Sequence, residues 1–425
     1  MGSHILRTHL PRLFGYRPMD SGDAHYVIFD FPTPIFVVAA AVTSKTTAAH
    51  IKADLMNRVF PNSLRAKQYP AYILGKAYWA EDPNFNIDNH LITVKQSITT
   101  LDELGVFAGS VAIEPVSTSK PLWCCYVVED FQGGSAVIVR FHHSYMDGVS
   151  MVNALVHNSD PTCPRVFFTL GESNSFRRFL TAPLSLMLVL FGLIAGMRQV
   201  PDRNPLMGIP YSGNKAIGMT QPFPLGVHLA RAKALGVTFN DYITAAVLRT
   251  VSAYIAKQHS TVQHHFTMGI PITLRGNPSD GSPLPAGNDI SYFPLSMPDV
   301  TSSTLEKDIG KIIKEIKAFP PVTEFPNLTT KVMTLFPKQF QRKIFARLGG
   351  KETFMLSNMS GPKALLSYDG VHIKSLFVSP IVGIPIAVAV VSYAEHFTLT
   401  FTTDIAIIKD PSALARLATT QLTST

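Results

Sequence analysis

Sequence signatures of several large enzyme classes are missing from this chain of 425 residues. It has no Gly-x-Ser-x-Gly nucleophile motif, no phosphate-binding glycine loop followed by Lys-Ser or Lys-Thr, and no dinucleotide-binding fingerprint. Hydrolase chemistry with a serine nucleophile, phosphate-loop nucleotide binding and nicotinamide binding therefore have no support from short motifs.

Charged side chains are also scarce. They make up 16% of the residues, against 46% for hydrophobic residues, so a large core is available and a lipid-facing patch is the simplest interpretation of the surface. The net charge of +8 comes from scattered Lys and Arg without basic-aromatic runs, which argues against a nucleic-acid partner. That charge suits an anionic bilayer or a phosphate-bearing acyl donor, and it does not distinguish the two.

Cysteine is rare as well. Only Cys124, Cys125 and Cys163 occur, and because sequence neighbours rarely form a structural disulfide, a reducing compartment is favoured. The adjacent pair is flanked by apolar residues and is expected to be buried packing. Residues 1–6 have no apolar signal core, and Leu6 stands where a myristoylation signal has Ser or Thr, so we expect neither secretion nor lipidation.

The hydrophobic pattern indicates two α/β domains, over residues 1–160 and 214–425, joined by an apolar crossover and linker over residues 161–213. Leu101 to Leu104 is expected to be a loop margin. The expected strands are Tyr26 to Phe31, Ile35 to Val42, Ser135 to Phe141, Val371 to Val378, Ile384 to Ser392 and Phe397 to Thr402. The expected helices are Leu225 to Leu235 and Phe239 to Lys257, and Pro201 to Gly213 has linker composition.

A long apolar stretch runs from Phe179 to Met197, with Arg177 and Arg178 before it and Arg198 after it. Its length is just sufficient to cross a bilayer. Two alternatives remain open, a crossover helix buried between domains and a helix that lies in the membrane interface.

The residues most suggestive of chemistry form the run from His142 to Gly148. The strand Ser135 to Phe141 ends at two histidines, and a helical pattern follows Gly148. Adjacent side chains on a strand point to opposite faces, so at most one histidine should serve a cleft, and a zinc site here is disfavoured. Asp147 has a structural alternative as the cap of the following helix.

This run has the form His-His-x-x-x-Asp-Gly, with His143 as its second histidine, and it resembles the signature of the coenzyme-A-dependent acyltransferase superfamily. Along most of its length the chain resembles the wax ester synthase/diacylglycerol acyltransferase family. The further matching segments are Phe85-Asn86-Ile87-Asp88-Asn89-His90, Pro121-Leu122-Trp123, Asn240-Asp241, Pro271-Ile272-Thr273-Leu274-Arg275, Gly287-Asn288 followed by Pro294-Leu295, and Ser357-Asn358-Met359-Ser360-Gly361-Pro362. The chain departs from the family at Asn86, where Asp is usual, and at Met359-Ser360, where Val-Pro or Val-Arg is common.

The resemblance implies two chloramphenicol-acetyltransferase-like α/β domains that form a V with a central substrate tunnel. His143 would act there as general base, and Asp147 would pair with either Arg65 or Arg275. Long-chain acyl-CoA would be a co-substrate, with no bound cofactor and no metal. The candidate substrate-contacting residues are Pro121, Leu122, Trp123, Asn240, Asp241, Asn288, Ser357, Asn358, Gly361 and Pro362, of which the run from Ser357 to Pro362 would line the donor channel. Core packing of Trp123, helix capping by Asn240 and Asp241 and a turn at Gly361-Pro362 are the structural alternatives.

The function that follows is a membrane-associated acyl-CoA:alcohol O-acyltransferase acting on a fatty alcohol or diacylglycerol. Its partner would be a membrane or lipid-droplet surface, at the endoplasmic reticulum in a eukaryote or the inner membrane in a bacterium. Two alternatives stay open, a related acyltransferase for soluble alcohols or amines and an inactive lipid-binding scaffold.

Overall fold

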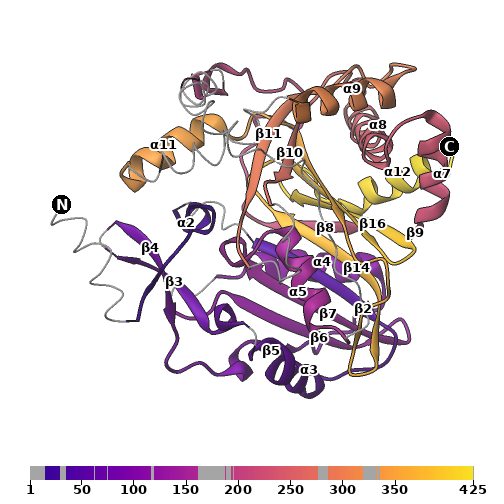
Figure 1. The fold of residues 1–425 in the computed structure, drawn as a ribbon. Helices are drawn as coiled ribbons and strands as arrows, with labels where there is room; N and C mark the ends of the chain where they lie inside the picture. The colour runs from indigo at the N-terminus through magenta and orange to yellow at the C-terminus, as the bar shows by residue number, and fades with distance from the viewer. Residues whose placement is uncertain are drawn as a thin grey trace.

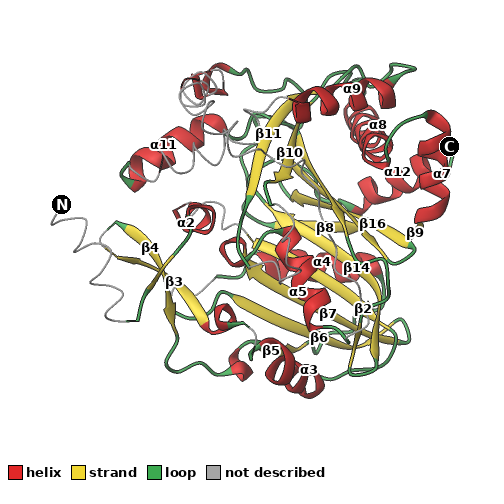
Figure 2. Cartoon of the chain, viewed as in Figure 1, coloured by secondary structure: helices red, strands yellow, loops and turns green. Residues whose placement is uncertain are grey.

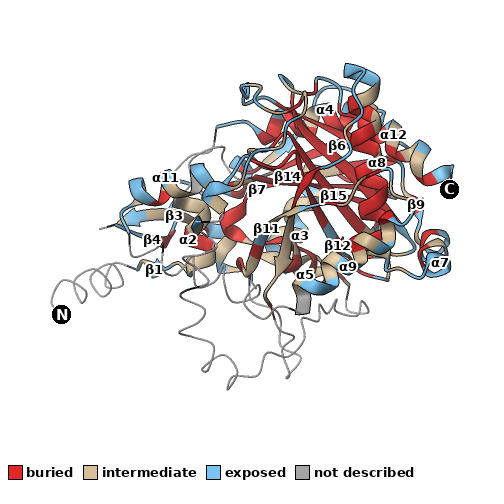
Figure 3. Ribbon diagram, turned by 90° about the horizontal axis from the view of Figure 1, so that it is seen from above, coloured by how far each residue is buried: buried red, intermediate tan, exposed pale blue. Residues whose placement is uncertain are grey.

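The computed structural model describes residues 15–28, 35–61, 63–73, 75–115, 119–160, 187, 193–194, 196–275, 286–318, 333 and 336–424. The chain is an α/β protein with two large mixed sheets and one small sheet (Figures 1 and 2). Buried residues concentrate on the strands of the large sheets and on the helices against them (Figure 3). The predicted α/β class is confirmed.

The first large sheet presents the histidine motif. Its strand order is β13 (Ser367–Tyr368), β14 (Val371–Ile381), β2 (Ile35–Val42), β7 (Gly134–His142), β6 (Trp123–Phe131) and β5 (Leu91–Thr93). All eight residues of β2 are buried and apolar, which is typical of a strand covered on both faces. The helices α4 (Leu101–Ala112) and α5 (Gly148–Asn158) belong to this half of the chain.

The second large sheet carries most of the C-terminal core. Its order is β11 (Ile290–Ser296), β10 (Thr267–Thr273), β12 (Phe354–Ser360), β15 (Ile386–Tyr393), β16 (His396–Asp404) and β8 (Lys215–Met219), with β9 (Phe223–Pro224) paired to β16. The helices of this half are α7 (Leu225–Leu235), α8 (Phe239–His259), α9 (Leu305–Ala318), α11 (Lys338–Leu348) and α12 (Ser412–Thr423). Ile243, Val247 and Val251 of α8 share one buried cluster with Phe397 and Phe401 of β16.

The two large sheets exchange elements. Strand β14 follows most of the second sheet in the chain, yet it pairs antiparallel with β2 in the first sheet. In return, Leu104 and Ala108 of α4 share a buried cluster with Ile217 and Met219 of β8. Sheet membership therefore does not follow chain order, and the division of the chain at residues 160 and 213 stays a prediction.

A small sheet and several short elements complete the N-terminal half. The small sheet has the order β1 (Arg17–Pro18), β4 (Lys76–Glu81) and β3 (Gln68–Ile73). The short elements are α2 (Ser21–Ile28), α3 (Ala48–Asp54), the π-helical η1 (Leu55–Val59) and the 3-10 turns η2 (Leu64–Lys67), η3 (Ile87–Asn89) and η4 (His143–Tyr145).

Most of the predicted elements are confirmed, but two predictions are wrong. The strand expected from Tyr26 is instead part of helix α2. Its aromatic and β-branched composition is overridden by tertiary contacts, above all those of the fully buried Asp23. The loop margin expected at Leu101 is the start of α4, where Thr100 and Glu103 form a reciprocal capping box.

Most of the apolar stretch from Phe179 to Met197 lies outside the described residues. Among the residues that are described, none of the helices has both the length and the apolar character needed to span a bilayer. Residues 201–213 form neither helix nor strand, as their linker composition predicts.

Candidate active site

Strand β7 delivers the histidine motif to the site. His142 is its last residue, the turn η4 follows from His143 to Tyr145, and Asp147 is the N-cap of α5. The predicted sequence of strand, tight loop and helix is confirmed. The His142 side chain turns back onto its own loop, where Nδ1 lies 2.8 Å from Oγ of Ser144 and accepts from the backbone N of Ser144 at 3.2 Å.

His143 is buried, and its imidazole contacts two aromatic rings. Its imidazole stacks on Tyr26 of α2, with ring centroids 3.8 Å apart and planes inclined by 8°. The Phe36 ring of β2 lies 4.4 Å away in a tilted arrangement. Elements from two separate N-terminal segments thus fix the plane of the imidazole.

The tautomer of His143 is set by Asn288. The amide Nδ2 of Asn288 donates to Oδ1 of Asp23 at 3.0 Å and to the carbonyl of His143 at 2.8 Å, so its Oδ1 must be an acceptor. That oxygen lies 2.8 Å from Nδ1 of His143. The proton of the neutral imidazole is therefore on Nδ1, and Nε2 carries the free lone pair.

The electrostatics of the site favour the neutral imidazole. Burial lowers the pKa of His143 to about 4, although the Asp147 charge and the Asn288 hydrogen bond act in the opposite direction. The base form is therefore populated at neutral pH. A general base must be unprotonated at the working pH so that it can accept a proton.

Asp147 combines both roles that its position in the sequence leaves open. Its Oδ1 accepts from the backbone N of Ser150 at 2.8 Å and caps α5. Its Oδ2 accepts from Nε of Arg275 at 3.2 Å and from the backbone N of Asp289 at 2.9 Å. Arg65 instead pairs with Asp23 at 2.7 Å, so Arg275 is the partner of Asp147.

A loop from the second half closes over the motif. The carbonyl of Gly287 accepts from the backbone N of Asp147 at 3.0 Å, from Oγ of Ser150 at 2.9 Å and from Nη2 of Arg275 at 2.5 Å. Gly287 has φ +146, a conformation that L side chains rarely adopt. The backbone at Gly287 leads directly into Asn288. Because Asn288 contacts both Nδ1 and the carbonyl of His143, it is a positioning residue for that histidine.

Gly148 lies at a close approach between the two halves of the chain, where the Met359 side chain would have to shift to admit a Cβ atom. A Cβ atom at this position would lie 2.4 Å from Sδ of Met359 on β12. Met359 is one of the residues at which the chain departs from the family pattern. Met359 therefore contacts the histidine motif at Gly148, the first residue of α5.

The segment Pro121-Leu122-Trp123 contacts the histidine motif through Tyr145. The backbone N of Leu122 donates to the Tyr145 hydroxyl at 2.8 Å, and Nε1 of Trp123 donates to the carbonyl of Ala66 at 2.8 Å. The Trp123 ring stacks on His90 with centroids 4.5 Å apart. These contacts are structural, and direct substrate contact by the segment stays a prediction.

Two downstream candidates meet in space. Nδ2 of Asn358 on β12 donates to Oδ1 of Asn240 on α8 at 3.0 Å. Asp241 instead completes the capping box of α8 with Thr238. Asn358 is exposed, whereas the preceding Ser357 is buried in the strand.

The last candidates, Gly361 and Pro362, lie against the end of β15. The backbone N of Gly361 donates to Oγ of Ser392 at 3.3 Å, and the carbonyl of Pro362 accepts from the backbone N of Ala394 at 2.7 Å. These contacts tie the two residues to the strand end, and their place in a donor channel stays a prediction.

Sequence reasoning missed Asp23, Tyr26 and Phe36. Asp23 is fully buried, where burial raises the pKa of its carboxyl and the Arg65 charge opposes that rise. None of the three carries a local signal, because their contacts with Asn288 and His143 are made across the fold, between segments that lie far apart in the sequence.

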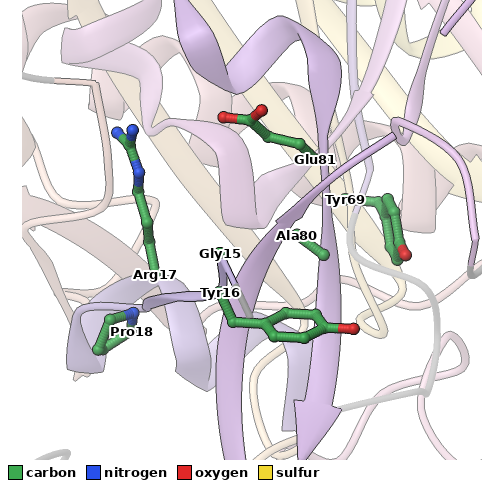
Figure 4. A pocket seen from close by; sticks show the side chains of 7 residues that line it. All are labelled: Gly15, Tyr16, Arg17, Pro18, Tyr69, Ala80 and Glu81. Carbon is green, nitrogen blue, oxygen red and sulfur yellow. The ribbon is translucent and has the colours of Figure 1, made fainter. Parts of the chain in front are cut away.

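Other possible sites in the described residues are few. No three His, Cys, Asp or Glu side chains in the described part of the chain come together as a metal site. Cys125 is buried, and burial raises the pKa of its thiol to about 12, so it is a poor nucleophile. Figure 4 shows a hollow on the small sheet, lined by Gly15, Tyr16, Arg17, Pro18, Tyr69, Ala80 and Glu81, none of which is a candidate residue.

Comparisons with known sequences all match O-acyltransferases of one family. The profile described as the wax ester synthase/diacylglycerol acyltransferase catalytic domain matches residues 38–203, and the C-terminal domain profile of the same family matches residues 286–425. Wax ester synthase/diacylglycerol acyltransferase 2 of Arabidopsis thaliana is 23% identical over 397 residues, which cover 81% of each chain. O-acyltransferase WSD of Acinetobacter baylyi is 21% identical over 383 residues, again 81% of each chain.

Solved structures share the fold at low sequence identity. A wax ester synthase/diacylglycerol acyltransferase from Marinobacter aquaeolei VT8 aligns with a TM-score of 0.65 at 14% identity, over 96% of this chain and 98% of that one. The first condensation domain of the calcium-dependent antibiotic synthetase aligns with a TM-score of 0.63 at 12% identity, over 96% of both chains. Both likenesses show a shared fold over nearly the whole length of the chains.

Proposed function

We infer the activity from one premise, that this chain belongs to the wax ester synthase/diacylglycerol acyltransferase family and is an O-acyltransferase of that type. We propose that it transfers a long-chain acyl group from acyl-CoA to the hydroxyl of a fatty alcohol or of diacylglycerol, and that it needs no bound cofactor. The observation that carries the mechanism is the 2.8 Å contact between Nδ1 of His143 and Oδ1 of Asn288, from which we infer that Nε2 carries the free lone pair.

In the proposed step, Nε2 of His143 accepts the proton of the acceptor hydroxyl while the oxygen attacks the thioester carbonyl carbon. The C–S bond then breaks, and the coenzyme A sulfur leaves with the proton returned by the imidazolium. A positioned base of this kind typically contributes about 10²–10⁴-fold to the rate. No covalent acyl-enzyme is required, because both substrates are held together at one base.

The surroundings of His143 support this role. The stacked Tyr26 ring holds the imidazole in plane and offers its π face to the imidazolium that forms during the reaction. The Nδ1 proton remains hydrogen-bonded to Asn288 in both states of the ring. The Asp147 charge favours the imidazolium as well.

A membrane or lipid-droplet surface is the proposed place of action. Long-chain alcohols and diacylglycerol reside in membranes, and the low charge density and net charge of +8 suit an anionic lipid surface. In a eukaryotic cell this surface would be the endoplasmic reticulum or a lipid droplet, and in a bacterium the inner membrane.

The test uses membranes that contain the wild type or the His143→Ala variant, with radiolabelled palmitoyl-CoA and either hexadecanol or dioleoylglycerol. We expect labelled wax ester or triacylglycerol from the wild type and a loss of at least about a hundredfold in the variant. His396→Ala is the matched control, because that histidine is exposed at the start of β16. Absence of label from both acceptors with folded wild type would refute the neutral-lipid proposal and direct attention to soluble acceptors.

A further inference from the structure

Helix α11 has the composition of a surface helix that meets lipid. The segment from Phe336 to Leu348 contains Lys338, Arg342, Lys343 and Arg347, and it contains no acidic residue. Phe340 is 44% exposed and Phe336 is 42% exposed. A solvated helix face would not need two large exposed aromatic side chains.

The exposed residues of α11 gather on one face. Phe340, Lys343 and Arg347 recur at spacings of three and four, which places them in a single stripe, and all three are exposed. The Phe336 ring packs on Phe340 with centroids 4.9 Å apart. Aromatic rings and basic side chains are thus combined on the same outward face, as in helices that lie at a bilayer interface.

A second exposed segment, with three apolar side chains and one arginine, adjoins the C-terminal end of α11. Leu348 lies directly against Gly196. Nζ of Lys351 donates to the carbonyls of Gly196 and Met197, at 2.6 Å and 3.1 Å, and fixes this segment beside the helix. The exposed residues of the segment around Gly196 are Ile194, Met197, Arg198 and Val200.

The N-terminal end of α11 leads toward the active site. Nζ of Lys338 lies over the ring of Tyr72 on β3, 5.1 Å from its centroid, and Tyr72 is itself exposed. At the other end of β3, the carbonyl of Gln68 accepts the hydroxyl of Tyr145, which lies in the turn η4 with His143. Figure 1 shows α11 and α2 on the side of the molecule that carries the small sheet.

We propose that the face formed by Phe336, Phe340, Lys343 and Arg347, with the adjoining Ile194, Met197, Arg198 and Val200, docks onto an anionic lipid bilayer. This surface is called the α11 face below. The proposal rests on the proposed function, since a membrane-resident acceptor gives the docking its purpose. Charge complementarity selects the occupant, because the two segments that form the face carry basic residues and no acidic ones.

The test is sedimentation of the purified full chain with vesicles of phosphatidylcholine alone or with phosphatidylglycerol. We expect binding that requires the anionic lipid and falls as salt is raised. The variant Lys343→Glu/Arg347→Glu should bind at least about tenfold more weakly. Its matched control is Lys233→Glu/Lys257→Glu, two exposed lysines on α7 and α8, which lie across the molecule from α11 (Figure 1).

The apolar contribution has its own pair of variants. Phe336→Ser/Phe340→Ser should weaken vesicle binding by about tenfold, whereas Val227→Ser/Leu235→Ser on α7 removes two equally exposed apolar side chains and should leave binding unchanged. Equal binding by the α11 variants and the wild type would overturn the proposal. So would equal binding to vesicles with and without anionic lipid, or light scattering that shows the face to be a contact between two copies of the chain.

Turnover of a short, water-soluble alcohol separates this inference from the proposed function. The α11 variants should retain that turnover, because their side chains lie outside the site of His143. Turnover by a wild type that binds no vesicles would overturn the docking and leave the reaction standing. Vesicle binding through the α11 face without turnover of any alcohol would refute the reaction and support the docking.

Discussion

Replacing Asp147 with Asn removes the negative charge from a network that joins the two halves of the chain. The carboxylate is fully buried, and its partner Arg275 has 9% of its side chain exposed. The amide can keep one acceptor for the backbone N of Ser150. Its NH₂ group would then face two donors, Nε of Arg275 and the backbone N of Asp289, so those two contacts are lost.

The expected cost is large because an unpaired guanidinium is left buried. Removing one partner of a buried ion pair typically costs about 3–5 kcal/mol. A loss of this size should lower the urea midpoint of unfolding by roughly 1 M. Turnover should fall as well, by about tenfold to a hundredfold in kcat, because Asp147 fixes the loop that carries His143.

The assay is urea unfolding together with kcat and KM for the wild type, Asp147→Asn, Arg275→Met and the double variant. Because the double variant removes both charges, its loss should be smaller than the sum of the two single losses. Ser150→Ala is the control for a neutral contact, since it removes only the hydrogen bond to Gly287, at a cost of about 1 kcal/mol.

Two results would refute this reasoning. A wild-type urea midpoint for Asp147→Asn would mean that the ion pair does not stabilise the fold. Strictly additive losses in the double variant would mean that Asp147 and Arg275 act independently, contrary to their 3.2 Å contact.

Three further predictions follow from the same site. The kcat/KM should be constant above pH 5 and fall as the pH drops through about 4, because a lowered pKa keeps His143 unprotonated above that value, and a limb near 6.5 would contradict this. Tyr26→Phe should keep most of the activity, whereas Tyr26→Leu should lose about twofold to tenfold in kcat with the loss of the stacked ring, as steady-state kinetics would measure. Gly148→Ala should cost about 1–3 kcal/mol in thermal or urea unfolding through its clash with Met359, and the same substitution in a Met359→Ala background should cost much less.

Local pattern was sufficient for the elements that carry the motif. Apolar strand composition before His142 and helical spacing after Gly148 are short-range signals, and both are confirmed. Asp147 could be foreseen as a cap for the same reason. Whether Asp147 pairs with Arg65 or with Arg275 could not be predicted locally, because Arg275 lies 128 residues further along the chain and reaches Asp147 only when the two halves of the chain meet.

The N-terminal contribution to the site was beyond local reasoning. The segment around Tyr26 has strand composition, but the buried contacts of Asp23 with Arg65 and Asn288 hold it as a helix. Asn288 was singled out by its place in a family segment, and its role in holding Nδ1 of His143 became visible only in three dimensions.

The late position of β14 in the chain has a consequence for folding during synthesis, because this strand pairs with β2 of the first sheet. During synthesis β2, an entirely apolar strand, emerges early, and β7 can pair with one of its edges, yet β14, its antiparallel neighbour on the other edge, is complete only at Ile381. Until then the open edge of β2 can recruit strands from other nascent chains. We therefore expect fragments that stop before β14 to aggregate, and chaperone dependence to persist late into translation.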